Sequence, residues 1–439
     1  MNWNWIFRTV WMLCLGVNDM SREMKDSGVE WIGEMPEDWN VQRVKNAFVR
    51  KKTEAHQENP VVLSLARAGV KVRDLSKNEG QIAESYYNYN LVDPGDLLLN
   101  PMDLYSGANC SVSNVKGVIS QAYINLRAQK GYNSKFYDYY FKTLYWAMVM
   151  FVHGKGVSFE NRWTLGIEEL FNYKIPVPLE CEQRKIANFL DDKCENIDTV
   201  IEKTKMSIEK YKKLKETIVV QTVTKGVEKK RKMKNTKIEW LEKIPFEWKE
   251  CRIKNVIFPV RKEVNDTDEI VTCFRDGAVT LRKNRREDGF TISFTEKGYH
   301  GVDKGDLVIH GMDAFAGAIG CSDSRGKITP VVHVCETTGN NRYFMYFLRS
   351  MAYGNILMDL SNGVRIRSSD YRNFAKLGIF RMCVPPLEEQ NLIVEFLDRK
   401  VNEIEKIVEK KQIFCQELEA YKKSLIYEYV TGKKEVPES

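Results

Sequence analysis

The sequence predicts an α+β protein made of two copies of one unit, in which a mixed α/β globular part is followed by a long helix. Two observations support this prediction. A set of residues recurs about 209 positions later in the chain, and each copy closes with a heptad pattern of about 40 residues. Each copy spans about 200 of the 439 residues, which suits a globular domain with an attached helix.

The internal tandem repeat is most evident at the start of each copy. Identical residues lie 209 positions apart for eight sites of the first copy: Lys25, Glu30, Trp31, Pro36, Trp39, Arg43, Lys45 and Asn46. Gly95-Asp96-Leu97 likewise matches Gly305-Asp306-Leu307, and Met102-Asp103 matches Met312-Asp313. The shift stays between 207 and 210 along the chain, which indicates a duplication.

Short strands are predicted in both globular parts, because apolar or alternating runs lie between Gly, Pro, Asn and Asp residues. These runs are 61–65, 97–99, 118–119 and 122–126 in the first copy, and 270–274, 307–309 and 331–334 in the second. One helix is predicted in each part, at about 134–151 and about 340–353. Together they predict a mixed α+β domain that is used twice.

Each copy ends in a long helix with one narrow apolar seam. The seams comprise Leu190, Cys194, Ile197, Ile201, Thr204, Ile208, Tyr211, Lys215 and Ile218 in the first copy, and Leu397, Val401, Ile404, Val408, Lys411, Cys415, Leu418, Lys422 and Leu425 in the second. Prolines precede both helices, and Gly226 and Gly432 follow them. A seam of four or more heptads predicts a coiled pair of helices. The alternative is that each helix packs on its own globular part.

The composition argues against several classes of protein. The 67 basic and 60 acidic residues give a net charge of +7, which permits a polyanionic partner. The 10 cysteines and 5 histidines show no zinc-ligand spacing, which favours a reducing cytoplasm. No apolar run of about 18 residues is present to span a membrane, and no phosphate-binding loop is present for nucleotide hydrolysis.

One segment shares part of a catalytic motif. Asn100-Pro101-Met102-Asp103 resembles the N/D-P-P-Y/F loop with which adenine methyltransferases hold the target amino group. The second proline and the aromatic residue are absent, and no glycine-rich cofactor loop accompanies the segment. Because the matching His310-Gly311-Met312-Asp313 keeps only Met-Asp, we expect a structural role for both segments.

A surface for nucleic acid is the remaining functional signal. A basic run at 229–234 follows the first helix and suits phosphate contacts, although a solvated hinge is an equal alternative. Loops at 153–162 and 360–369 and basic clusters near 51–73 and 275–286 carry side chains that suit base edges, whereas a helix-capping turn is the structural alternative for the loops. The candidate DNA-binding residues are Lys51, Lys52, Arg67, Lys71, Arg73, Lys155, Ser158, Asn161, Arg162, Arg275, Arg282, Arg285, Asn362, Arg365 and Arg367. No catalytic, cofactor-binding or metal-binding residue is predicted.

These segments resemble the specificity subunits of type I restriction–modification systems. The similarity is carried by residues 25–33 with Pro36 and Trp39, by both Gly-Asp-Leu segments, and by the Pro-Leu-Glu helix starts at 178–183 and 386–390. It extends from residue 25 to about residue 432. The resemblance implies two target-recognition domains separated by two long antiparallel coiled-coil helices, with pseudo-twofold symmetry between the copies.

The resemblance also implies a function without catalysis. Each recognition domain of such a subunit reads one half of a bipartite asymmetric site in double-stranded DNA, and the helices set the spacer and act as a scaffold. The expected partners are two modification (methyltransferase) subunits that bind S-adenosylmethionine, and restriction (translocase/nuclease) subunits that use ATP and Mg²⁺. The alternative is a self-sufficient adenine-specific DNA methyltransferase or restriction enzyme, or a fragment of one.

The expected domain boundaries follow from the repeat and the seams. They are a non-native N-terminal extension at 1–20, a first target-recognition domain at 21–179, a central helix at 180–224, a basic linker at 225–236, a second target-recognition domain at 237–386, a C-terminal helix at 387–431 and a tail at 432–439. Residues 1–20 depart from the resemblance, and we expect the natural start at Met20 or Met24.

Overall fold

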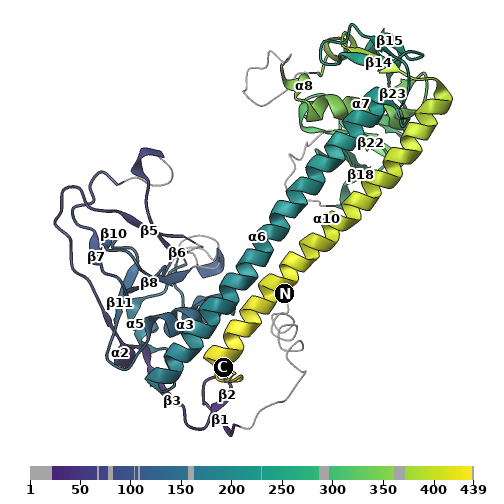
Figure 1. The fold of residues 1–439 in the computed structure, drawn as a ribbon. Helices are drawn as coiled ribbons and strands as arrows, with labels where there is room; N and C mark the ends of the chain where they lie inside the picture. The colour runs from purple at the N-terminus through teal and green to yellow at the C-terminus, as the bar shows by residue number, and fades with distance from the viewer. Residues whose placement is uncertain are drawn as a thin grey trace. The chain divides into compact units, whose positions relative to one another are not determined.

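The computed structural model describes residues 22–66, 69–77, 83–102, 104–106, 109–156, 163–228, 230–285, 296–359 and 371–437. Its residues form two compact units, and two long helices each contribute to both of them (Figure 1). The first unit comprises the chain up to Lys203 together with the part from Phe414 onward, and the second comprises Thr204–Ile413. The predicted extension at 1–20 lies outside the described residues.

The first unit contains a four-stranded antiparallel sheet in the order β4-β11-β8-β9. Its strands are β1 (Met24–Asp26), β2 (Glu34–Pro36), β3 (Asn40–Arg43), β4 (Phe48–Arg50), β5 (Leu63–Ala66), β6 (Gly69–Val72), β7 (Asn90–Val92), β8 (Leu97–Leu99), β9 (Cys110–Val112), β10 (Gly117–Ile119), β11 (Ile124–Ala128) and β12 (Lys174–Val177). Its short helices are α2 (Val44–Ala47), α3 (Ser134–Trp146), α4 (Val149–Val152) and α5 (Ile167–Asn172), with 3₁₀ helices at Leu75–Lys77 and Leu104–Ser106. Helix α3 packs on β8 and β9, and contributes the aromatic side chains Phe136, Tyr137, Tyr140 and Phe141 to the core.

The second unit repeats this arrangement with a sheet in the order β16-β23-β20-β21. Its strands are β13 (Met233–Asn235), β14 (Lys243–Pro245), β15 (Lys249–Arg252), β16 (Ile257–Val260), β17 (Val271–Cys273), β18 (Val279–Leu281), β19 (His300–Val302), β20 (Leu307–His310), β21 (Ile319–Cys321), β22 (Gly326–Ile328), β23 (Val332–Thr337) and β24 (Arg381–Val384). Its short helices are α7 (Asn341–Tyr353), α8 (Ile356–Asp359) and α9 (Phe374–Gly378), with 3₁₀ helices at Ile253–Asn255, Arg282–Asn284 and Ala314–Ala316. Helix α7 packs on β20, β21 and β23, as α3 packs in the first unit.

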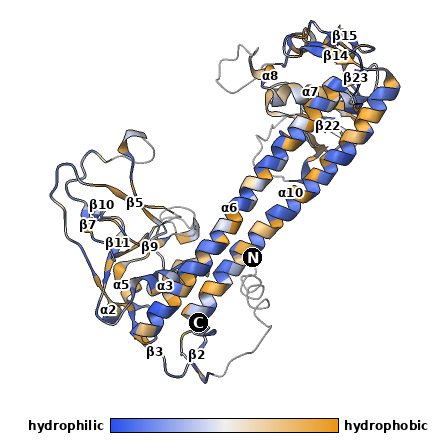
Figure 2. Cartoon of the chain, viewed as in Figure 1, coloured by the Kyte–Doolittle hydropathy of each residue, from blue (hydrophilic) through white to orange (hydrophobic). Residues whose placement is uncertain are grey.

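The two long helices, α6 (Glu180–Lys225) and α10 (Leu387–Val430), pair antiparallel in each unit. In the first unit the Lys422 ammonium lies 2.6 Å from the Asp198 carboxylate, and in the second the Lys215 ammonium lies 3.1 Å from Glu405. In both pairs the residue numbers of the two partners add to 620. Two antiparallel helices with a constant sum keep the same alignment of residues in both units. The predicted seam residues are buried or half-buried in both helices, and hydrophobic residues alternate with hydrophilic ones along each helix (Figure 2).

A repeated clamp attaches the start of each long helix to its own domain. In the first unit the Trp39 indole donates to Glu182 at 3.0 Å, and the Arg22 guanidinium lies 2.7 Å from the same carboxylate. In the second unit the Trp248 indole donates to Glu389 at 2.8 Å, and Arg231 pairs with that carboxylate. Both tryptophans are buried, so each clamp satisfies an indole N–H that water cannot reach.

Gln183 and Gln390, which follow the two clamp glutamates, make a second repeated contact at the start of each long helix. The Gln183 amide donates to the Pro178 carbonyl at 2.9 Å and accepts from the Asn133 N–H at 2.8 Å. Gln390 makes the same two contacts, to the Pro385 carbonyl and from the Asn340 N–H, both at 2.9 Å. Each glutamine therefore connects its long helix to the cap of the domain helix α3 or α7.

The predicted α+β class, the internal repeat and the paired antiparallel helices are confirmed, with two differences in detail. Each globular part was predicted to hold one helix, which is wrong, because short helices such as α5 and α9 also form. The predicted helix at about 134–151 is interrupted where Met148 adopts a left-handed conformation (φ 58°) between α3 and α4. The long helices also pack on their own domains, since Leu190 and Leu397 lie in the two domain cores.

None of the described helices is long and apolar enough to cross a lipid bilayer.

Candidate nucleic-acid interface

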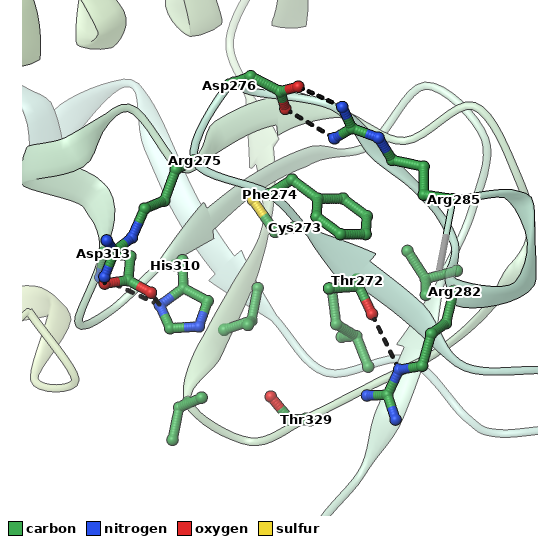
Figure 3. A pocket seen from close by; sticks show the side chains of 14 residues that line it. Thr272, Cys273, Phe274, Arg275, Asp276, Arg282, Arg285, His310, Asp313 and Thr329 are labelled. Carbon is green, nitrogen blue, oxygen red and sulfur yellow. Dashed lines mark hydrogen bonds and ion pairs between the residues drawn. The ribbon is translucent and has the colours of Figure 1, made fainter. Parts of the chain in front are cut away.

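A concave pocket of about 810 Å³ in the second unit brings three of the candidate arginines together (Figure 3). Strand β17, the segment after β18, the end of β20 and the segment after β22 form it. Its lining comprises the apolar residues Val271, Cys273, Phe274, Ile328, Val331 and Val332, and the polar residues Thr272, Arg275, Asp276, Arg282, Arg285, His310, Asp313 and Thr329. A concave surface that combines apolar side chains with convergent polar groups is typical of a binding site.

Two of the pocket arginines are held by carboxylates. Arg285 donates two hydrogen bonds to Asp276, at 3.0 and 2.5 Å, and its guanidinium lies 4.5 Å from the centre of the Phe274 ring. Arg275 donates to Asp313 at 2.9 Å. Burial opposes ionisation of Asp276, but the hydrogen bonds from Arg285 and from the Ala278 N–H lower the pKa of Asp276 below its usual value. Both ion pairs therefore hold the guanidinium groups of Arg275 and Arg285 in place beside the pocket.

The third arginine, Arg282, follows β18 and has a structural equivalent in the first domain. The backbone N–H of Arg282 donates to the Ile270 carbonyl at 2.8 Å, and its Nε donates to the Thr272 hydroxyl at 3.3 Å. In the first domain the backbone N–H of Arg73 donates to the Val62 carbonyl, also at 2.8 Å. The two arginines, both predicted to bind DNA, therefore occupy the same position of the repeated hairpin.

His310 faces the pocket from the end of β20. Its Nδ1 accepts hydrogen bonds from the backbone N–H groups of Met312 and Asp313, at 3.3 and 3.1 Å. Burial lowers the pKa of His310 below its usual value, and the charge of Arg275 lowers it further, whereas Asp313 raises it. These contacts favour a neutral imidazole that carries its proton on Nε2.

The candidates of the first domain are spread over several elements. Lys52 and Lys71 are exposed, and Arg73 is half-buried. Lys155 is exposed and its ammonium lies 3.0 Å from the Glu169 carboxylate. Its backbone pairs with that of Thr164. Lys52, Lys71 and Arg73 therefore stay predictions that the geometry permits.

Lys51 has a structural role that its sequence neighbourhood did not indicate. Its ammonium lies 2.7 Å from Asp93 and 2.9 Å from Asp96, and only 14% of the side chain is exposed. Hydrogen bonds from Lys51 and Arg127 lower the pKa of Asp93 to about 2. Lys262 makes the same contacts with Asp303 and Asp306, so the repeated Gly-Asp-Leu segments supply a buried carboxylate to an internal lysine.

The basic run that follows the first helix is also partly structural. Arg231 belongs to the clamp on Glu389, and the Lys234 ammonium donates to the Trp248 carbonyl at 2.6 Å. The Lys232 ammonium lies 4.6 Å from the centre of the Phe246 ring. The run predicted as a linker thus includes β13 and anchors the second domain.

Seven candidates lie outside the described residues. They are Arg67, Ser158, Asn161, Arg162, Asn362, Arg365 and Arg367. No sequence pattern marks Thr272, Phe274, Asp276 or His310 as binding residues, although the repeat aligns His310 with Asn100. In the part of the chain that the structure describes, no group of three or more His, Cys, Asp or Glu side chains is placed to hold a metal ion.

Comparison with known proteins gives a consistent result. No family model matches the chain. A type I restriction enzyme specificity subunit, MjaVIII of Methanocaldococcus jannaschii, is 23% identical over 365 residues, which cover 78% of this chain and 80% of the relative. A chain from a solved structure on complex assembly and conformational transition of the type I restriction–modification system aligns with a TM-score of 0.64 at 14% identity, and covers 91% of this chain and 99% of that one.

The HsdS subunit from Thermoanaerobacter tengcongensis aligns with a TM-score of 0.48 at 14% identity, over 91% of this chain and 98% of that one. The relative and the fold match both extend over most of the chain, as the repeated motifs do. The resemblance predicted from the sequence is therefore confirmed: this chain is similar to the specificity subunits of type I restriction–modification systems.

Proposed function

We propose that this chain is the sequence-specific DNA-binding specificity subunit of a type I restriction–modification complex. Each domain reads one half of a bipartite asymmetric site, and α6 and α10 set the spacer between the halves. The chain itself performs no catalysis. Two modification subunits bind S-adenosylmethionine and methylate DNA, and restriction subunits use ATP and Mg²⁺.

The observation that supports this proposal is that the two domains share one structural framework but differ in some of the residues that would contact DNA. The clamp, the Gly-Asp-Leu ion pairs and the helix register are the same in both halves. Some residues of the second-domain pocket differ from their equivalents in the first domain. The register places Ser64 where the second domain has Thr272, and Ala66 where it has Phe274, whereas Arg282 keeps its equivalent in Arg73. Two related domains with different contact residues suit two different half-sites.

The pocket suits DNA better than it suits a catalytic centre. Arginine side chains pair with guanine edges or phosphates, and threonine hydroxyls accept or donate to either. The pocket combines three arginines and two threonines with apolar side chains such as Phe274. The competing proposal of a self-sufficient methyltransferase requires that the chain bind S-adenosylmethionine by itself.

A domain exchange tests the proposal. The chain would be co-expressed with its modification subunits, and methylated adenines would be mapped by long-read sequencing of host DNA. Exchange of residues 41–175 for those of a relative should change one half-site and leave the other half-site and the spacer intact. A change in both half-sites, or methylation by the chain without its partners, would contradict the proposal.

A further inference from the structure

Residues 100 and 310 occupy equivalent positions in the two domains. Asn100 follows β8 and His310 ends β20, which are the matching central strands of the two sheets. The backbone N–H of Asn100 donates to the Asn109 carbonyl at 2.8 Å, and that of His310 donates to Ala318 at 3.0 Å. The Met-Asp pair follows two residues later in both copies. The polypeptide therefore places these two side chains in the same local geometry.

The following loop orients both side chains in the same way. The Asn100 Oδ1 accepts from the backbone N–H of Met102 at 3.0 Å. The His310 Nδ1 accepts from the N–H groups of Met312 and Asp313. Each side chain thus uses an acceptor atom to hold its loop, and the remaining polar atom is a hydrogen-bond donor: the amide nitrogen of Asn100 or the Nε2–H of His310.

The donor of His310 is available to a ligand. In the part of the chain that the structure describes, His310 Nε2 makes no hydrogen bond. Figure 3 shows this nitrogen on the side of the ring that faces away from Asp313, within the pocket that Arg282 and Thr329 also line. Because the single lone pair of Nδ1 is used by the loop, a neutral His310 can donate but cannot accept.

We propose that residues 100 and 310 are paired specificity positions, and that His310 donates from Nε2 to a hydrogen-bond acceptor on a base of the second half-site. This inference rests on the proposed function. Guanine offers two acceptors in the major groove and thymine offers one beside its methyl group, whereas the cytosine amino group offers only a donor. Arg282 keeps its equivalent in Arg73, whereas residues 100 and 310 differ between the domains, so this pair is suited to reading different bases.

The test exchanges the two residues one at a time. His310→Asn keeps an acceptor for the Met312 N–H and therefore the loop. It also keeps a donor, but the asparagine amide nitrogen lies closer to the backbone than Nε2 and stops short of the base that Nε2 would contact. We expect the base preference at one position of the second half-site to weaken by roughly tenfold, as the loss of one hydrogen bond to a base implies, with the first half-site unchanged. Asn100→His should alter the first half-site alone.

The readouts are the methylated motif and the binding of the complex to sites substituted at each position. His56→Asn is the matched control, because His56 is exposed, belongs to a different loop and has a positive φ of 47° that asparagine tolerates. It should leave both half-sites unchanged. Preferences within twofold of wild type in both exchange variants, or a change in the wrong half-site, would overturn the inference.

A second measurement does not depend on any variant. Nuclear magnetic resonance of the full chain labelled with ¹⁵N-histidine should show His310 as the Nε2–H tautomer, and its Nε2 signal should shift when the complex binds its site. An Nδ1–H tautomer would refute the inference. The proposed function fails separately, if the wild-type complex methylates no bipartite motif.

Discussion

Removal of the Glu389 carboxylate should destabilise the second unit strongly, because a buried indole and a half-buried guanidinium both depend on it. The Trp248 side chain is fully buried and its indole donates to Glu389 at 2.8 Å, while only 14% of Arg231 is exposed. A buried donor left without an acceptor costs about 1–3 kcal/mol, and Arg231 keeps a weaker contact with Glu247 at 3.2 Å. We therefore expect Glu389→Ala to cost about 2–3 kcal/mol.

Calorimetry of the full chain would measure this cost as a fall in melting temperature of about 5–10 °C for a unit of this size. Glu388→Ala is the matched control, because Glu388 is exposed and lies in the same first turn of α10, so both variants lose the same favourable interaction with the helix dipole. Equal melting temperatures for the two variants would refute the assignment of Glu389 as the clamp. Glu182→Ala should repeat the effect in the first unit through Trp39 and Arg22.

Two further predictions concern charge. Asp198→Lys should place like charges at the Lys422 contact and lower the free energy of unfolding by about 0.5–1 kcal/mol at low salt. Lys422→Asp in the same chain should restore most of that stability. A double variant that is no more stable than Asp198→Lys in thermal unfolding would contradict the register of the two helices. His300 and His310 both have a pKa lowered by burial, so the unfolded chain binds more protons than the folded chain below about pH 6.5. The stability of the protein should therefore fall as the pH drops from about 6.5 to about 5. This window lies above the pH range in which carboxylates usually titrate. Chemical denaturation at several pH values would measure this slope, which His310→Asn should reduce; an unchanged slope would show that His310 does not contribute.

Local patterns predicted much of the fold. The predicted strands at 97–99 and 307–309 match β8 and β20 because fully buried strands are continuous apolar runs between turn residues. The heptad seams predicted which faces of α6 and α10 are buried, because apolar residues that recur every three or four positions lie on one face of a helix. Short helices such as α5 were missed, because six residues carry too little periodicity to be recognised.

The candidate site was predicted less completely, because its contacts join segments far apart in the chain. Lys51 was a candidate for DNA binding by its sequence, but the fold places Asp93 and Asp96 beside its ammonium group. Arg231 looked like part of a solvated linker, but its partner Glu389 lies 158 residues further on. A basic residue in a run has the same sequence signal whether it meets solvent, DNA or a carboxylate.

The sequence by itself determined that the protein is a duplicated α+β chain with two long helices, because repetition and periodicity are properties of neighbouring residues. Only the tertiary structure decided which charged side chains are internal and which line the pocket, and that His310 presents its Nε2 proton there. Those outcomes depend on the pairing of β17 with β18 and on the loop after β20, which bring residues 271–332 together in space.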